Sequence, residues 1–575
     1  MDAALNKVEP DLIIAGANLV NVNTREIYKS DIVVKKEKIV FVGDFHNRFA
    51  NNTSIIKADG LYAVPGFIDS HIHVESSMLT LSEFSRIVTQ HGTSSVIWDP
   101  HELVNVVGLD GLKIVISEAK KLPLHVFFVV PSCVPSAPNR ETPGATLSAI
   151  DISHALKLPM VVGLGEMMDF QGVLSCSSRT TRELELAKKK HMLIDGHAPG
   201  LCGKELCAYI ASGVWSDHES VNEEEGLEKL RLGMWLMIRE GSTSKDLSTL
   251  IKPLVRGAVD SRHCVLVSDD RSANDLLLEG HVDHLLRIAV SEGLDPITAL
   301  QLVTANPASY MHVENEMGSI SPGRVADIVL LDDLNKMDIK RVILRGKELS
   351  SVSIVKAFKY PTAVTSTMNI RGKLIPSDFV IASKDERGSA DVRVIKLKEE
   401  TLYTSAEIRC LRIEDHSIKA SGDTLHAAII DRHHRTGNIG KGFITGLGFL
   451  KGAISQTIAH DSHNLIVVGS NPLDMSVAAK AVASIHGGIA LASDRKIVAI
   501  IKLEIAGLMS ADRVEEVAER NVFLEDAAKR LGVQVKSPIV TLSFLSLPVI
   551  PKLRLTDKGL FSVDENRFVD PIVKQ

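Results

Sequence analysis

Between residues 64 and 270 the chain alternates short apolar runs with stretches of helical spacing, and this alternation constrains the fold more than any other feature. Residues 81–90, for example, carry apolar side chains at helical intervals between two such runs. Apolar runs separated by helices favour parallel βα units, and eight parallel strands close a (β/α)8 barrel. We therefore predict an α/β fold with such a barrel. The eight apolar runs cover residues 64–73, 93–99, 125–133, 161–166, 191–197, 213–218, 232–240 and 264–270.

Most of these runs end on a side chain that can bind a metal ion. His71 and His73 end the first run, and residues i and i+2 of a strand share a face, so both imidazoles would point the same way. The active sites of such barrels lie at the carboxyl ends of the strands. Each residue alone is more often an ordinary polar group, but together they predict one metal site. The other residues at run ends are Asp99, Glu166, His197, His218 and Asp269.

Short strand-like segments lie on both sides of the barrel region. Those before residue 62 and those after residue 316 would pair most simply with each other, which predicts a small β-sandwich domain from residues 1–62 and 316–357. The catalytic barrel would then span residues 63–315. Within it, Asp295 and Pro296 are the N-cap and first residue expected of a helix. Residues 370–575 are long enough for a C-terminal domain of α/β or α+β type.

The composition excludes several classes of function. Aromatic residues make up 4% of the chain and the formal net charge is -6, so neither stacking platforms nor a basic surface for nucleic acid is expected. No apolar run reaches the roughly 18 residues of a membrane span. The six cysteines are scattered, which is typical of reduced thiols, and we expect a cytoplasmic protein with a small-molecule substrate.

The barrel region carries five motifs in order, at residues 67–78, 99–102, 165–168, 195–201 and 218–220. Together they resemble the amidohydrolase superfamily, and within it the bacterial adenine deaminases. The resemblance continues beyond the barrel, in residues 460–464, 505–510 and 545–551. It therefore covers nearly the whole chain and is more specific than any single motif.

The resemblance implies a site of two divalent metal ions. Imidazole and carboxylate ligands suit Mn, Fe or Zn, and Mn is expected first. Some superfamily members bridge their ions with a carboxylated lysine, but residues 160–168 contain no lysine, so a carboxylate would take that role. The implied ligands are His71, His73 and Asp269 for one ion, His197 and His218 for the other, and Glu166 as the bridge.

The implied reaction converts adenine and water to hypoxanthine and ammonia. A hydroxide that bridges the two ions would attack C6 of the purine. Asp269 is the expected general base, which takes the proton of the hydroxide and passes it to the leaving amine. Glu166 could do part of this work, and the sequence does not separate the two roles.

Two other functions stay open on the sequence. Another amidohydrolase could act on a cyclic amide such as a hydantoin or a dihydroorotate-like ring, although the missing lysine counts against it. A catalytically inactive barrel could bind a metal or purine as a regulatory subunit. The zinc nucleobase deaminases need a Pro-Cys-x-x-Cys motif beside His-x-Glu, and the spacing of Cys202 and Cys207 does not supply it.

For four polar residues near the motifs, the sequence leaves two alternative roles. Asp99, His101, Glu75 and Ser76 would contact the purine or orient ligands, or else form loop hydrogen bonds. Asp270 and Glu102 could simply cap the helices that follow them, and the sequence leaves their roles open.

Three features of the C-terminal region complete the expectations. His460 and His463 would belong either to a lid that reaches the barrel mouth or to a loop held by its own side chains. Residues 432–435, Arg-His-His-Arg, are expected in a solvated turn. The apolar residues 540–548 are expected in the core, and a homo-oligomer that uses them as an interface stays open.

Overall fold

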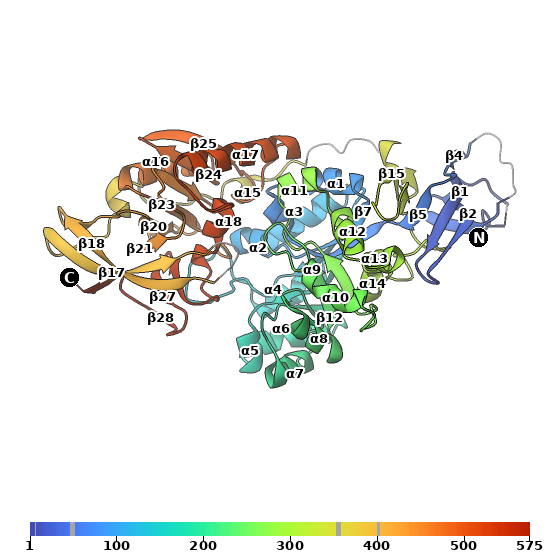
Figure 1. Ribbon diagram of the computed structural model, residues 1–575, viewed down its shortest axis with the longest axis horizontal. Coiled ribbons are helices and arrows are strands. Elements are labelled where there is room, and N and C mark those ends of the chain that lie inside the picture. Colours follow the sequence, from blue (N-terminus) through green and yellow to red (C-terminus); the bar gives the residue numbers. More distant parts are fainter. Residues whose placement is uncertain (6, 46–51, 352–357, 399–402, 575) are drawn as a thin grey trace.

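The computed structural model describes residues 1–5, 7–45, 52–351, 358–398 and 403–574, and it is elongated (Figure 1). An N-terminal β-sheet lies at one end, the helix-rich central part in the middle, and a large C-terminal sheet at the other end. Residues 352–357, at the end of the expected first domain, lie outside the described residues.

The central part contains two parallel sheets whose strands overlap the eight predicted runs. One sheet has the order β10-β9-β8-β7-β6, and the other has the order β11-β12-β13. β10 contacts β11, and a parallel bridge between Ile72 and Asp269 joins the region after β13 to β6. The carboxyl ends of the strands therefore gather at one end. The strands are β6 (Phe67–Ile72), β7 (Thr93–Trp98), β8 (His125–Val130), β9 (Val161–Met167), β10 (Leu193–Gly196), β11 (Ser216–Asp217), β12 (Trp235–Arg239) and β13 (Cys264–Val267).

Amphipathic helices connect these strands and pack apolar faces against them. In α1 (Leu81–Gln90), Phe84, Ile87 and Val88 are buried, and Thr80 caps the helix by accepting the N–H of Glu83. The other main helices are α2 (His101–Val107), α3 (Leu109–Ala119), α4 (Ala149–Ala155), α6 (Ser178–Lys188), α7 (Gly203–Ala211), α8 (Glu223–Arg231), α11 (Ala273–Leu278), α12 (Val282–Ser291) and α13 (Pro296–Gln301).

The predicted cap at Asp295 is confirmed. Its side chain accepts the backbone N–H of Thr298 at 2.9 Å, and Pro296 is the first residue of α13. A proline suits this position because its missing N–H would have no partner within the helix.

The N-terminal sheet contains strands from both sides of the central part. β14 (Ile328–Leu331) pairs antiparallel with β5 (Tyr62–Pro65), as the sequence predicts. The strands form one connected sheet, however, where the sequence predicts a sandwich. β1 (Leu12–Asn21) is bulged between Ile14 and Ala17, so that its first half pairs with β4 and its second half with β5. The remaining strands are β2 (Glu26–Lys35), β3 (Lys38–Gly43), β4 (Ser54–Lys57), β15 (Ile339–Leu344) and β16 (Lys347–Glu348).

The C-terminal sheet is almost entirely antiparallel, so this region is of α+β rather than α/β type. Its order is β19-β18-β17-β21-β20-β23-β22-β24-β25, with β29 beside β17, and among the strands that the structure describes here only β17 and β21 pair in parallel. Helices α16 (Pro472–Ser484) and α17 (Val514–Arg530) pack on it. The strands are β17 (Arg387–Lys396), β18 (Ser405–Glu414), β19 (Ser417–Ile418), β20 (Leu425–Ile430), β21 (Ile439–Thr445), β22 (Ala453–Gln456), β23 (Leu465–Gly469), β24 (Gly488–Ser493), β25 (Lys496–Lys502) and β29 (Ile572–Lys574).

The C-terminal region packs directly on the central part. Leu79 bridges Ser510, and α17 lies against α11. The apolar segment around α18 (Pro538–Ser543) is buried, with Leu542 and Leu545 fully covered, so the expectation of a core segment is confirmed. Among the described residues, none of the helices combines the length and apolar character that crossing a membrane requires.

Candidate metal centre

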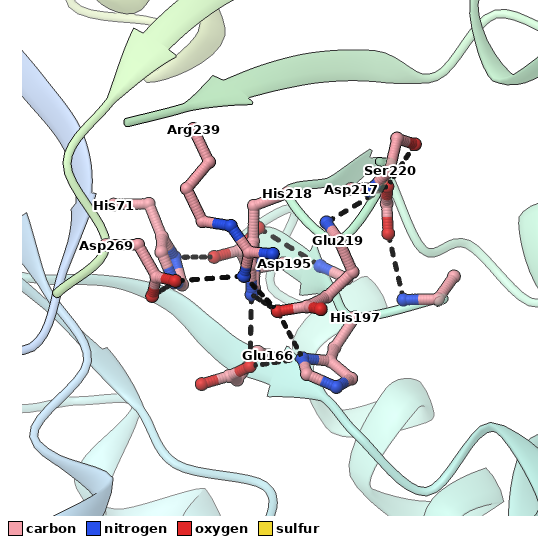
Figure 2. A network of polar contacts seen from close by, with 12 residues as sticks. His71, Glu166, Asp195, His197, Asp217, His218, Glu219, Ser220, Arg239 and Asp269 are labelled. Atoms are coloured by element: carbon pink, nitrogen blue, oxygen red, sulfur yellow. Dashed lines mark hydrogen bonds and ion pairs between the residues drawn. The ribbon is translucent and has the colours of Figure 1, made fainter. Parts of the chain in front are cut away.

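All six expected metal ligands converge at the carboxyl ends of the parallel strands. His71 lies next to the last residue of β6 and His73 directly follows that strand, Glu166 lies in β9, and Asp269 follows β13. His197 and His218 directly follow β10 and β11. Figure 2 shows five of these six side chains pointing into one space. Five of the six are buried and His197 is partly exposed, so the polar atoms of the buried five have to be satisfied by one another or by a ligand.

His71, His73 and Asp269 form a first group. Asp269 Oδ1 lies 3.6 Å from His71 Nε2 and 3.3 Å from His73 Nε2. Asp269 has a φ of 58°, a left-handed conformation that is uncommon for a residue other than glycine. Strained backbone of this kind clusters at functional sites.

Glu166, His197 and His218 form a second group. Glu166 Oε2 lies 2.8 Å from His197 Nδ1 and 3.4 Å from His218 Nε2. The other oxygen, Oε1, lies 3.3 Å from His73 Nε2 in the first group. The carboxylate of Glu166 therefore stands between the two groups and faces each with a different oxygen.

Hydrogen bonds on the outer side fix the imidazoles of the first group. Asp195 Oδ2 lies 2.8 Å from His71 Nδ1, and the backbone oxygen of Asp99 lies 3.0 Å from His73 Nδ1. If these Nδ1 atoms carry the protons, both Nε2 atoms have a free lone pair toward the site. His71 Nε2 is buried and has no hydrogen-bond partner in the described part of the chain. This arrangement fits a metal ion.

The electrostatics of the site favour charged ligands. Burial raises the pKa of Glu166, but the imidazoles of His197 and His218 outweigh it and hold that pKa well below its usual range. The same balance of burial against His71 and His73 holds the pKa of Asp269 well below its usual range. Both carboxylates are therefore ionised at neutral pH.

The pKa values of the imidazoles His71 and His197 shift upward instead. Burial lowers the pKa of His71, yet Asp195 more than compensates, so the net shift is well upward. For His197, the carboxylates of Glu219 and Glu166 overcome burial and raise the pKa to about 9. A metal ion that binds here has to displace protons.

Two charged residues at the site were not predicted from the sequence. Arg239, at the end of β12, lies 3.0 Å from Asp269 Oδ2 and also contacts Glu219 (Figure 2). It contacts Asp246 as well. Glu219 Oε1 lies 3.5 Å from His218 Nε2. Arg239 is the last residue but one of the seventh run, and this position was the available signal, but an arginine side chain does not bind metal ions.

The four further candidates lie beside the ligands. Asp99 accepts the N–H of Glu166 at 3.0 Å, and His101 Nδ1 lies 3.4 Å from Glu166 Oε1. Glu75 accepts the indole N–H of Trp98 at 2.6 Å. Ser76 donates to Asp270. Asp99 and Glu75 thus hold elements of the site in place, whereas His101 faces it.

Neither expected helix cap is observed. Ser272, not Asp270, caps the helix α11 by accepting the N–H of Asp275. Glu102 lies within the first turn of α2, and its Oε1 atom lies 3.1 Å from His460 Nδ1 in the C-terminal region. Long-range side-chain pairing took precedence over local capping in both places.

The turn expected at residues 432–435 is only partly solvated. Arg432 and His433 are buried, with exposed fractions of 0% and 8%, whereas His434 is exposed. Arg432 donates to the backbone oxygen of Ala506 and to the hydroxyl of Thr367. The prediction was wrong because these remote acceptors satisfy the guanidinium inside the protein.

Comparison with known proteins gives matches along nearly the whole chain. Residues 62–349 match the model of the amidohydrolase family, and residues 401–567 match the adenine deaminase C-terminal domain. The chain is 42% identical to the adenine deaminase of Methanococcoides burtonii, over 99% of this chain and 97% of that protein. Similar relatives are the adenine deaminases of Archaeoglobus fulgidus (42% identical, 97% and 95% covered) and Clostridium botulinum (40% identical, 99% and 96% covered).

Proposed function

Because this chain belongs to the adenine deaminase family of amidohydrolases, we propose that it hydrolyses adenine to hypoxanthine and ammonia at the cluster around Glu166. The observation that carries the proposal is the position of Glu166, whose two carboxylate oxygens face two separate groups of imidazole ligands at 2.8 to 3.4 Å.

The residues present fit two divalent metal ions. His71, His73 and Asp269 would hold one ion, His197 and His218 the other, and Glu166 would bridge them. Such ions lower the pKa of a shared water and so supply a hydroxide at neutral pH. The family implies divalent metals. We propose Mn, with Fe or Zn as alternatives, because imidazole and carboxylate ligands suit all three.

Asp269 is the residue that we assign to proton transfer. Its Oδ1 atom faces the imidazoles, while Oδ2 is held by Arg239 at 3.0 Å, so the carboxylate has one fixed orientation. It would accept the proton of the attacking water and pass it to the departing amine, so that ammonia leaves as the C6–N bond breaks. Glu166 is the alternative for part of this proton transfer, since its carboxylate also faces the site.

Asp99 and Glu75 would act as supports rather than as contacts to the purine, since their carboxylates already accept hydrogen bonds from protein groups. His101 would face the purine or an ion. Ser76, through Asp270, would shape the rim of the pocket.

The proposed function also goes with a domain architecture, which we infer from the strands and the sequence. We propose that the eight parallel strands form a closed (β/α)8 barrel over residues 63–315, with residues 1–62 and 316–357 as one domain and 370–575 as another. The cytoplasmic location, the absence of nucleic-acid and membrane partners, and a homo-oligomer stay predictions from the sequence.

The direct test is ammonia release from adenine by protein that has been stripped of metal and reloaded with Mn. Adenosine, cytosine and dihydroorotate serve as the comparison substrates. Metal-dependent turnover of adenine alone supports the proposal. Opening of the cyclic amide with inert adenine would instead favour a hydantoinase-like or dihydroorotase-like activity, and no turnover of any substrate would favour a binding protein.

A further inference from the structure

A histidine of the C-terminal region reaches into the edge of the metal cluster. His460 Nδ1 lies 3.1 Å from Glu102 Oε1, although 358 positions separate the two residues in the sequence. Glu102 follows His101, and His101 Nδ1 lies 3.4 Å from Glu166 Oε1. One polar side-chain atom from each of His101, Glu102 and His460 lies within 4.8 Å of the others, so these side chains extend from the C-terminal region toward the bridging carboxylate.

The imidazole of His460 is held firmly by its own region. Its ring stacks on Phe544, with centroids 4.6 Å apart and an angle of 14° between the planes. Its backbone N–H donates to the oxygen of Ser543 at 2.9 Å, and its backbone oxygen accepts the hydroxyl of Ser546 at 3.1 Å. This is a fixed position rather than that of a side chain on a free loop.

Glu102 depends on this contact. Its side chain belongs to a residue that is 3% exposed, and His460 is its one ion-pair partner within the described ranges. A buried carboxylate without a partner is costly, so an unpaired Glu102 would turn or take up a proton. His460 therefore decides where the carboxylate points.

We propose that His460 is a positioning residue of the active site, which holds the Glu102 carboxylate as a hydrogen-bond acceptor for the N–H groups of the purine. The inference rests on the proposed function and adds to it a role for the C-terminal region. A carboxylate can only accept hydrogen bonds, and adenine offers a ring N–H and an amine to such an acceptor. The C-terminal region then completes the purine pocket instead of only packing beside the barrel.

The test is a double-mutant cycle with His460→Ala and Glu102→Gln, measured as kcat/KM on whichever substrate of the comparison panel the wild type turns over. Loss of a hydrogen bond to a charged group predicts that His460→Ala lowers kcat/KM by about ten- to a hundredfold. In the Glu102→Gln background the same substitution should have almost no further effect, because the group that it positions has lost its charge. His460→Gln, whose amide can still donate, should recover part of the loss.

The matched control is His434→Ala. His434 belongs to the same region and also contacts the central part, through Pro143 O at 2.9 Å, but it does not touch Glu102. His434→Ala should leave kcat/KM unchanged, and the metal content should stay at two ions per chain in every variant.

Three outcomes would overturn the inference. They are unchanged kinetics of His460→Ala, an equal loss in both Glu102 backgrounds, or a third bound metal ion that His460→Ala removes. If the wild type deaminates adenine and the cycle fails, only this inference falls. If the wild type turns over a cyclic amide instead, the proposed function falls while the cycle still tests His460.

Discussion

The ammonium group of Lys229 lies 2.8 Å from Asp217 Oδ2, and both side chains are completely buried. The same ammonium group donates to the backbone oxygen of Ala198 at 2.8 Å. Ala198 follows His197 and Asp217 precedes His218, so a single lysine on α8 connects the two chain segments that carry these imidazoles. Lys229 therefore holds together the two segments that carry His197 and His218, although it is not a ligand itself.

Lys229→Met is expected to destabilise the central part by about 3–5 kcal/mol, because it leaves the Asp217 carboxylate buried without its partner. The three tryptophans of the chain, Trp98, Trp215 and Trp235, all lie in the central part, so urea unfolding followed by their fluorescence reports on it. Lys113→Met is the control, since Lys113 pairs with Asp110 on the exposed face of α3 and its loss should cost at most about 1 kcal/mol. Equal effects of the two substitutions would contradict the assignment.

Asp195→Ala is expected to weaken metal binding. Asp195 orients His71 by accepting from its Nδ1 atom at 2.8 Å, and loss of such an outer partner typically costs about 10–100-fold in metal affinity. Competition of the protein with a chromophoric chelator measures the change. Tyr310→Phe removes a weak contact to the same carboxylate, at 3.4 Å, and one to the Ser216 hydroxyl, at 3.2 Å, and should bind metal like the wild type. Unchanged affinity of Asp195→Ala would show that His71 does not depend on this partner.

Asp269→Asn tests the proton transfer. The amide can still offer an oxygen to a metal ion but cannot take up the proton, so kcat should fall by roughly 10²–10⁴-fold while KM changes little. Metal analysis of the same samples separates this effect from loss of an ion. Asp246→Asn is the matched control, because Asp246 also pairs with Arg239, at 3.2 Å, but belongs to neither ligand group. A fully loaded Asp269→Asn protein with nearly normal kcat would assign the proton transfer to another residue.

Much of the site could be predicted because its geometry follows from local patterns. Strands were visible as apolar runs, and parallel strands place their carboxyl ends together, so His71, Glu166 and His218 meet without any knowledge of tertiary contacts. The alternation of apolar runs with stretches of helical spacing was enough to predict the helices between the strands. The positions of the ligands thus follow from the order of the strands.

The partners of the ligands could not be predicted, because they depend on which distant side chains face each other. Asp195 is 124 positions from His71, and Lys229 looks like an ordinary solvent-facing lysine of a charged helix. Glu102 and His460 lie in different regions and share no pattern. Likewise, the burial of Arg432 depends on remote backbone oxygens, to which local polarity gives no clue.

Metal uptake by the stripped protein should release protons at neutral pH. The pKa of His197 is raised to about 9, since Glu219 and Glu166 outweigh its burial, so the imidazole carries a proton below that pH and must lose it to bind an ion. Apparent affinity should therefore rise with pH, roughly tenfold per unit for each proton released, and level off near pH 9 as far as His197 is concerned. Calorimetric titration in two buffers with different ionisation enthalpies counts the protons. Glu219→Gln removes a carboxylate that raises this pKa, so fewer protons should be released. An affinity that does not change with pH would mean that the metal ion does not displace a proton from His197.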